Sequence, residues 1–161
     1  MNLFVQLKSK KGFTLIELLV VIGILAVLLA ITLIAINPAR QFQQANDTKR
    51  RSDVSAILNA INQYMSDRSG AIPTGITTTS QNISNTLANL CALLAPTYIA
   101  TLPSDPTTGS PVGSVPITCG TYDTDYEVVR SGANNRMTVC ADSEQGVGGL
   151  PPAANDLCVT R

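Results

Sequence analysis

Apolar residues form an almost unbroken run from Phe13 to Ile36, and Glu17 is the one charged residue within it. About 20 helical residues, each rising about 1.5 Å, cross the roughly 30 Å hydrocarbon core of a membrane. The run therefore predicts a membrane-spanning helix over residues 13–36. An acid inside such a helix costs about 2.5–3.5 kcal/mol on insertion scales unless it is paired, so Glu17 is a candidate functional residue.

A second helical pattern follows the apolar run after an interruption. Pro38 has no N–H and its ring crowds the carbonyl of Ile34, so the helix is expected to bend near this residue. Beyond it, apolar residues recur at spacings of three and four: Val54, Ile57, Leu58, Ile61, Tyr64 and Met65. The rest of the helix surface is expected to carry Lys49, Arg50, Asp53, Asn59, Asn62 and Asp67. Residues 37–69 are thus predicted to be the amphipathic half of one long helix, with Gly70 as its C-terminal cap.

Residues 70–161 have the pattern of a small globular head. A loop rich in Thr, Ser and Asn is expected over 74–85, followed by a short helix over 87–94 that is opened by Ser84 or Asn85 and closed by Pro96. Strands are predicted over 117–122, 126–130 and 137–141, with turns at 123–125 and 131–135 and an irregular tail from 146 to 152. The predicted fold class is α+β, in which the long N-terminal helix packs on a small antiparallel β-sheet.

Four cysteines lie after the apolar run, and no two of them form a Cys-x-x-Cys pair. Because the chain has no His, a zinc site would need all four thiolates from scattered positions. Two disulfides in an oxidising compartment fit better than four free buried thiols, and the sequence leaves three connectivities open. The favoured arrangement joins Cys91 to Cys119, tying the short helix to the first strand, and Cys140 to Cys158, pinning the tail to the last strand.

The junction before the apolar run indicates processing. The leader is rich in lysine and ends at Gly12. Cleavage after Gly12 would leave a cationic amine on Phe13, four positions before Glu17, and residues four apart share one face of a helix. The same amine has the alternative of pairing with Glu17 of an adjacent copy. A secretory signal has an apolar region of about 7–15 residues, which is shorter than this run, so we favour a processed helix that stays with the protein.

The residues at this junction resemble a known signal. Residues 10–21, Lys-Lys-Gly-Phe-Thr-Leu-Ile-Glu-Leu-Leu-Val-Val, are similar to the class III signal of type IV pilins and of the pseudopilins of type II secretion. This resemblance implies that a prepilin peptidase cleaves between Gly12 and Phe13 and methylates the new amine. It also implies that Glu17 docks an incoming subunit onto the N-terminus of its neighbour.

The resemblance extends more loosely into the rest of the chain. The spacing of residues from Arg51 to Pro73 looks like the half-buried helix of pilins, and the segment Leu102–Pro106 is similar to one found after the short helix of pilin-like proteins. By analogy with pilin filaments, Pro38 is expected to mark the place where the helix loosens on assembly.

Composition and motifs exclude other classes of protein. Eleven basic residues balance eleven acidic ones, unlike the strongly basic balance of a nucleic-acid binder. With no His, no nucleophile–base set and no Gly-rich phosphate loop, the chain is not expected to be an enzyme or to need a cofactor. Five acids could contribute to a calcium site like the one that major pseudopilins have in a late loop: Asp105, Asp123, Asp125, Asp142 and Glu144, of which Asp123 and Asp125 are the candidates retained. These acids lack the regular spacing of a calcium loop, and turn chemistry explains Asp105 and Asp123 as well.

The sequence therefore predicts a structural subunit that waits in the inner membrane with its basic leader inside and then polymerises into an extracellular pilus-like filament. Membrane lipid and identical subunits are its expected partners, and the resemblance to pilins implies the prepilin peptidase and an assembly platform protein with its ATPase as well. The nearest alternative is a pseudopilin of a type II secretion or DNA-uptake machine, which would form a periplasmic pseudopilus. An alternative of another class is a monomeric, signal-anchored envelope protein that binds a ligand.

Overall fold

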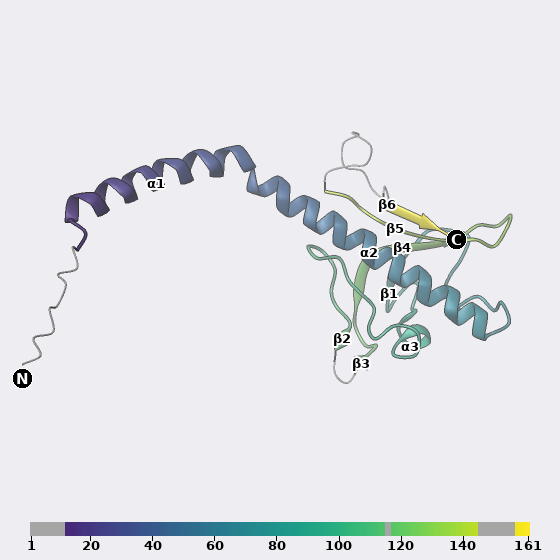
Figure 1. Cartoon of the computed structure of the whole chain (residues 1–161). Coiled ribbons are helices and arrows are strands. Elements are labelled where there is room, and N and C mark those ends of the chain that lie inside the picture. The colour runs from purple at the N-terminus through teal and green to yellow at the C-terminus, as the bar shows by residue number, and fades with distance from the viewer. Residues whose placement is uncertain (1–11, 115–116, 145–156) are drawn as a thin grey trace, which may run out of the picture. The chain divides into compact units, whose positions relative to one another are not determined.

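The computed structural model describes residues 12–114, 117–144 and 157–161. Two sequence predictions, the leader before Gly12 and the irregular tail over 146–152, lie outside the described residues. The chain divides into two compact units, Met1–Gln41 and Phe42–Arg161, and each is described by itself. The long apolar helix and the small antiparallel sheet confirm the α+β fold class (Figure 1).

Helix α1 (Leu15–Ile36) makes up most of the described part of the first unit. It begins two residues later than the sequence predicts, because Thr14 has extended backbone angles and serves as the N-cap. It ends at Asn37, which has a left-handed φ of 47°. Helix α2 (Pro38–Asp67) begins at the next residue, and a proline is well tolerated there because the first N–H groups of a helix have no intrahelical partner. The two helices are therefore interrupted beside the proline that the sequence analysis singles out.

The apolar stripe predicted for α2 forms part of the core of the second unit. Val54, Ile57, Leu58 and Ile61 are completely buried. After Asp67 the chain closes in a Schellman motif, in which the N–H of Gly70 donates to the carbonyl of Met65 at 2.7 Å. Both Ser69, with φ 55°, and Gly70, with φ 86°, are left-handed there. The helix thus ends two residues before the predicted end at residue 69, and Gly70 belongs to the motif that caps it.

Four strands form the antiparallel sheet of the second unit, in the order β1-β4-β5-β6 (Figure 1). These strands are β1 (Gln81–Ser84), β4 (Asp123–Arg130), β5 (Met137–Ala141) and β6 (Leu157–Thr160). β4 and β5 form a hairpin across the predicted 131–135 turn, which is closed by a 2.8 Å hydrogen bond from the N–H of Ser131 to the carbonyl of Arg136. A separate ladder pairs β2 (Gly113–Ser114) with β3 (Ile117–Thr118), so only the start of the strand predicted over 117–122 is present.

Alternation along β4 places one face of the sheet in the core. Thr124, Tyr126 and Val128 are fully buried, whereas Asp123 and Asp125 between them are exposed. Tyr126 and Val128 join the buried side chains of α2 in one hydrophobic cluster. The hydroxyl of Tyr126 also donates to Asp53 on α2 at 2.9 Å, which gives this buried polar group a partner.

Several predictions for the head are wrong. The predicted loop over 74–85 contains β1, and β6 lies beyond the predicted irregular tail, in a segment for which no strand is predicted. Residues 123–125 belong to β4 instead of a turn. Two features typical of a turn are nevertheless present within the strand: the Asp123 carboxylate accepts the N–H of Asp125 at 3.0 Å, and Asp125 has a left-handed φ of 57°.

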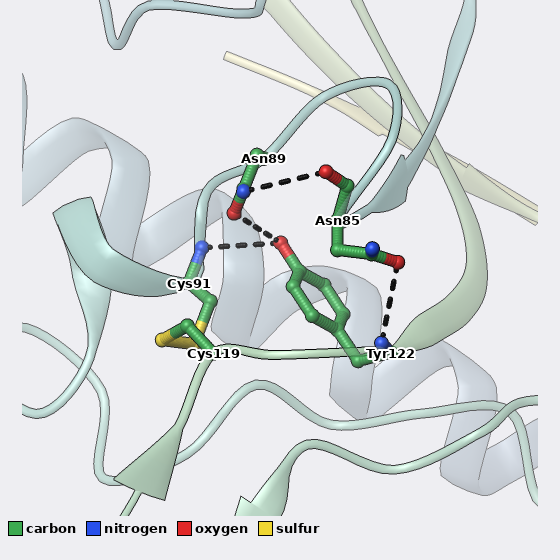
Figure 2. The surroundings of a disulfide bond; sticks show 5 residues. All are labelled: Asn85, Asn89, Cys91, Cys119 and Tyr122. Atoms are coloured by element: carbon green, nitrogen blue, oxygen red, sulfur yellow. Dashed lines mark hydrogen bonds between the residues drawn. A yellow bond between two sulfur atoms is a disulfide. The ribbon is translucent and has the colours of Figure 1, made fainter.

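The short helix is also shorter than predicted, since α3 covers only Cys91–Leu94. The residues before α3 are hydrogen-bonded to Tyr122 and do not form a helix (Figure 2). The Tyr122 hydroxyl accepts the N–H of Cys91 at 3.2 Å and donates to Asn89 at 3.0 Å, while the N–H of Tyr122 donates to the side chain of Asn85 at 3.3 Å. These long-range bonds replace the i to i+4 bonds that a longer helix would make.

Two disulfides cross-link the head. Cys91 is bonded to Cys119 and Cys140 to Cys158, which is the arrangement favoured among the three connectivities that the sequence leaves open. They join residues 28 and 18 positions apart. Disulfides of this kind each stabilise a small domain by about 2–4 kcal/mol.

Candidate functional site at the start of the apolar helix

The start of α1 is a capping box formed by Thr14 and Glu17. The hydroxyl of Thr14 accepts the N–H of Glu17 at 3.3 Å, and the N–H of Thr14 donates to the Glu17 carboxylate at 2.8 Å. The hydroxyl of Thr14 donates to the same carboxylate oxygen at 2.7 Å. The box thus satisfies N–H groups that the helix itself leaves without partners.

This arrangement lowers the cost of placing an acid in an apolar helix. Glu17 lies in the first turn of α1, where the helix dipole favours negative charge. Both bonds from Thr14 end on Oε2. Within the part of the chain that the structure describes, Oε1 accepts no hydrogen bond and stays available to a donor from another molecule.

Phe13 lies ahead of this box and is 86 % exposed. Because Thr14 is the N-cap, Phe13 is outside the helix, and the shared helical face expected for Phe13 and Glu17 is not formed in the uncleaved chain. The partner that the sequence analysis missed is Thr14. Its signal was present, since Thr-Leu-Ile-Glu has the spacing of a capping box before an apolar run.

The remainder of α1 is uncovered on every side. None of its residues is buried, and large apolar side chains are exposed along its whole length. Among the described residues, it is the one helix long and apolar enough to cross a membrane, with a mean hydropathy of 3.2. Such a surface needs lipid or other apolar helices around it.

A buried ionic cluster in the head was not foreseen. Arg50, expected on the surface of α2, is only 3 % exposed. Its guanidinium donates to Asp105 at 2.5 and 3.1 Å, to Asp47 at 2.9 Å and to Glu144 at 2.9 Å. The prediction for Arg50 is wrong because its partners are 55 and 94 positions away in the sequence and only the fold brings them together.

The charges in this cluster depend on one another. Burial alone would raise the pKa of the Asp105 carboxyl, but hydrogen bonds from Arg50 and Thr107 outweigh burial and hold that pKa well below its usual range. The hydrogen bond to Asp105 in turn raises the pKa of Arg50. Both groups are therefore charged at neutral pH and tie α2 to the loop around Asp105.

The carboxylates of the two calcium candidates, Asp123 and Asp125, each accept a hydrogen bond from another side chain of the head. Asp123 accepts from Asn82 at 2.8 Å, and Asp125 accepts from Thr108. Among the described residues, no three or more His, Cys, Asp or Glu side chains form a group that could hold a metal ion. Calcium binding at Asp123 and Asp125 stays a prediction.

Residues 7–33 match the family model of the prokaryotic N-terminal methylation motif. The matched range contains Gly12, Phe13, Thr14 and Glu17, so the capping box lies inside the motif. Among curated proteins and solved structures, none matches the chain. The match supports a type IV pilin-like protein, and α1 is by length and composition able to cross a membrane.

Proposed function

We propose that this protein is the structural subunit of a type IV pilus-like filament. The observation that carries the proposal is the methylation motif at the start of a fully exposed apolar helix whose first turn holds an acid. Proteins with this motif are structural, and an exposed apolar helix is suited to pack against identical helices.

Processing would create the group that Glu17 binds. A prepilin peptidase would cut between Gly12 and Phe13 and methylate the new amine of Phe13. In the assembled fibre, Glu17 of one subunit would accept hydrogen bonds from the amine of the next through Oε1, while Thr14 keeps Oε2 in place. An amine and a carboxylate in an apolar environment attract each other strongly, so this pair would stabilise the one alignment of neighbouring helices in which the two groups meet.

Before assembly, the subunit would rest in the inner membrane. The helix α1 satisfies its own backbone groups, which permits a stay in lipid. An assembly platform protein and its ATPase would then extract the subunit, and contacts between apolar helices would replace those with lipid.

Variants at residues 14 and 17 test the role of the acid. Glu17→Leu should leave insertion and cleavage intact but stop filament growth, as seen by electron microscopy of sheared surface material. Glu17→Gln keeps a side chain that can complete the capping box but has no charge, so it should fail in the same way. Thr14→Val keeps the charge and loses the cap, and should reduce filament number less than either Glu17 variant. Normal filaments from Glu17→Leu would refute the docking role.

The same microscopy addresses the alternatives. Long surface filaments that bind antibody to this chain support a pilus, whereas filaments seen only inside the envelope support a pseudopilus. A cell-bound chain that is never cleaved and never polymerises would instead be the anchored binding protein.

A further inference from the structure

The two disulfides lie in different surroundings. Cys91 is completely buried in the hydrophobic core of the head, and the half-buried Cys119 packs against the same core. The backbone of Cys91 is also held by the buried Tyr122 (Figure 2). An attacking reagent would have to displace core side chains to reach this bond along the Cys91 side.

The second disulfide lies outside this core cluster and is exposed at one of its two cysteines: Cys140 is buried, at 6 % exposed, whereas Cys158 is exposed. Cys140 and Cys158 face each other across β5 and β6, with their Cα atoms 4.1 Å apart. On β6, Leu157 and Val159 pack against the core, so the alternating residues Cys158 and Thr160 face outward and are exposed. In the neighbouring pair on this outer face, the hydroxyls of Thr138 and Thr160 are joined at 2.8 Å; Thr160 is exposed and Thr138 is half-buried.

We propose that Cys158 is a site of thiol–disulfide exchange in the folded protein and that its substrate is a dithiol. The geometry supports this role because Cys158 is exposed on an outer strand, so a reagent can approach the bond from its side although Cys140 is buried, whereas the Cys91–Cys119 bond is set into the core. The inference goes beyond the proposed function and does not depend on it.

The exchange is a two-step transfer of two electrons. A thiolate of the dithiol attacks Sγ of Cys158, the bond to Cys140 breaks, and Cys140 leaves as a thiolate that takes a proton from water. The second thiol of the reagent loses its proton and attacks the mixed disulfide, which releases Cys158 as a thiolate. The protein disulfide is reduced to two thiols while the dithiol is oxidised to a disulfide. The reverse reaction, with an oxidised dithiol, forms the bond.

Reduction would loosen one strand and leave the rest of the head cross-linked. β6 is an outer strand, and without the disulfide it is held by its ladder to β5, by the reciprocal bonds between Met137 and Arg161 at 2.8 and 2.9 Å, and by the burial of Leu157. The redox state of this disulfide therefore decides whether β6 is cross-linked to β5.

A neighbouring acid should slow the exchange. Glu127 on β4 lies directly opposite Cys140 on β5, and directly opposite residues of an antiparallel pair project from the same face. Its negative charge opposes both the incoming thiolate and the leaving thiolate of Cys140. Glu127→Gln should speed up reduction about two- to five-fold, the range expected for a partly exposed pair of charges. Asp67→Asn, which removes an exposed acid from α2, is the matched control and should change nothing.

The test uses the full chain, purified in detergent, with dithiothreitol as the dithiol. Samples are quenched with acid at intervals, alkylated and analysed by peptide mass spectrometry, and circular dichroism follows the fold. Cys140 and Cys158 should become alkylated at a rate proportional to the concentration of dithiothreitol, while Cys91 and Cys119 stay oxidised until urea is added.

Three results would overturn the proposal: reduction of Cys91–Cys119 first, loss of both bonds together at a rate independent of reductant, or no reduction of Cys140–Cys158 without denaturant. An unchanged rate in Glu127→Gln, with selective reduction preserved, would overturn the role assigned to Glu127.

Discussion

Glu17 and Arg50 are two charged residues in opposite surroundings: Glu17 is exposed and Arg50 is buried. Glu17 is exposed on an apolar helix and is held by the backbone and hydroxyl of its neighbour Thr14. Arg50 is buried in the head and is held by carboxylates from three segments. The local bonds of Glu17 leave one oxygen for an outside donor, whereas the partners of Arg50 all belong to the chain. This contrast makes Glu17 the residue suited to assembly and Arg50 the residue suited to stability.

Arg50→Met should lower the free energy of unfolding by about 3–5 kcal/mol, because it leaves the buried carboxylates of Asp47 and Asp105 without their counter-charge. Arg51→Met is the matched control, since Arg51 is exposed, and it should change stability by no more than about 0.5 kcal/mol. Urea unfolding of the detergent-solubilised chain, followed by circular dichroism, measures both. Equal effects of the two substitutions would contradict the importance of the cluster.

The elements of the fold differ in how readily the sequence reveals them. α1, α2 and β5 have long or clearly alternating apolar patterns, and the sequence predicts their positions closely. β1 and β6 are strands of only four residues, β1 is mostly polar, and Ile83 and Leu157 are the apolar residues that each strand buries in the core. Such strands are defined by pairing with β4 and β5, which is information that no local pattern contains.

The functional residues likewise divide into those that a local sequence pattern reveals and those that only the fold reveals. The sequence contains the whole capping box, because Thr14 and Glu17 are three residues apart. The partners of Arg50 are scattered, so a basic residue with acids nearby looks like any solvated helix surface. Arg50 becomes recognisable only when the fold brings Asp105 and Glu144 against α2.

At the scale of one element, Tyr122 fixes the approach to α3. Burial raises the pKa of Tyr122, so its hydroxyl stays protonated at neutral pH and can donate to Asn89 while it accepts from Cys91. Tyr122→Phe should cost about 1–3 kcal/mol because it leaves the buried N–H of Cys91 without a partner. Tyr98→Phe is the control, since it keeps the edge-to-face ring contact with Tyr64. Urea unfolding compares the two, and an equal loss would show that the hydroxyl of Tyr122 has no special role.

The whole molecule combines two units with opposite needs. The first presents an apolar helix with no buried residue, and the second has a closed core, two disulfides and a buried ionic cluster. The exposed apolar helix needs lipid or other apolar helices around it, whereas the second unit has a core of its own and two disulfides, a kind of bond that persists in an oxidising environment. The proposed move of the subunit from membrane to filament would satisfy both needs, because it would change the surroundings of the first unit.

The most direct test of this account is the intact mass of the chain recovered from filaments sheared off the cell surface. The account predicts a chain that begins at Phe13, carries one methyl group on its amine and retains both disulfides. A filament chain that begins at Met1 or at any residue other than Phe13, or the absence of this chain from the filaments, would contradict it.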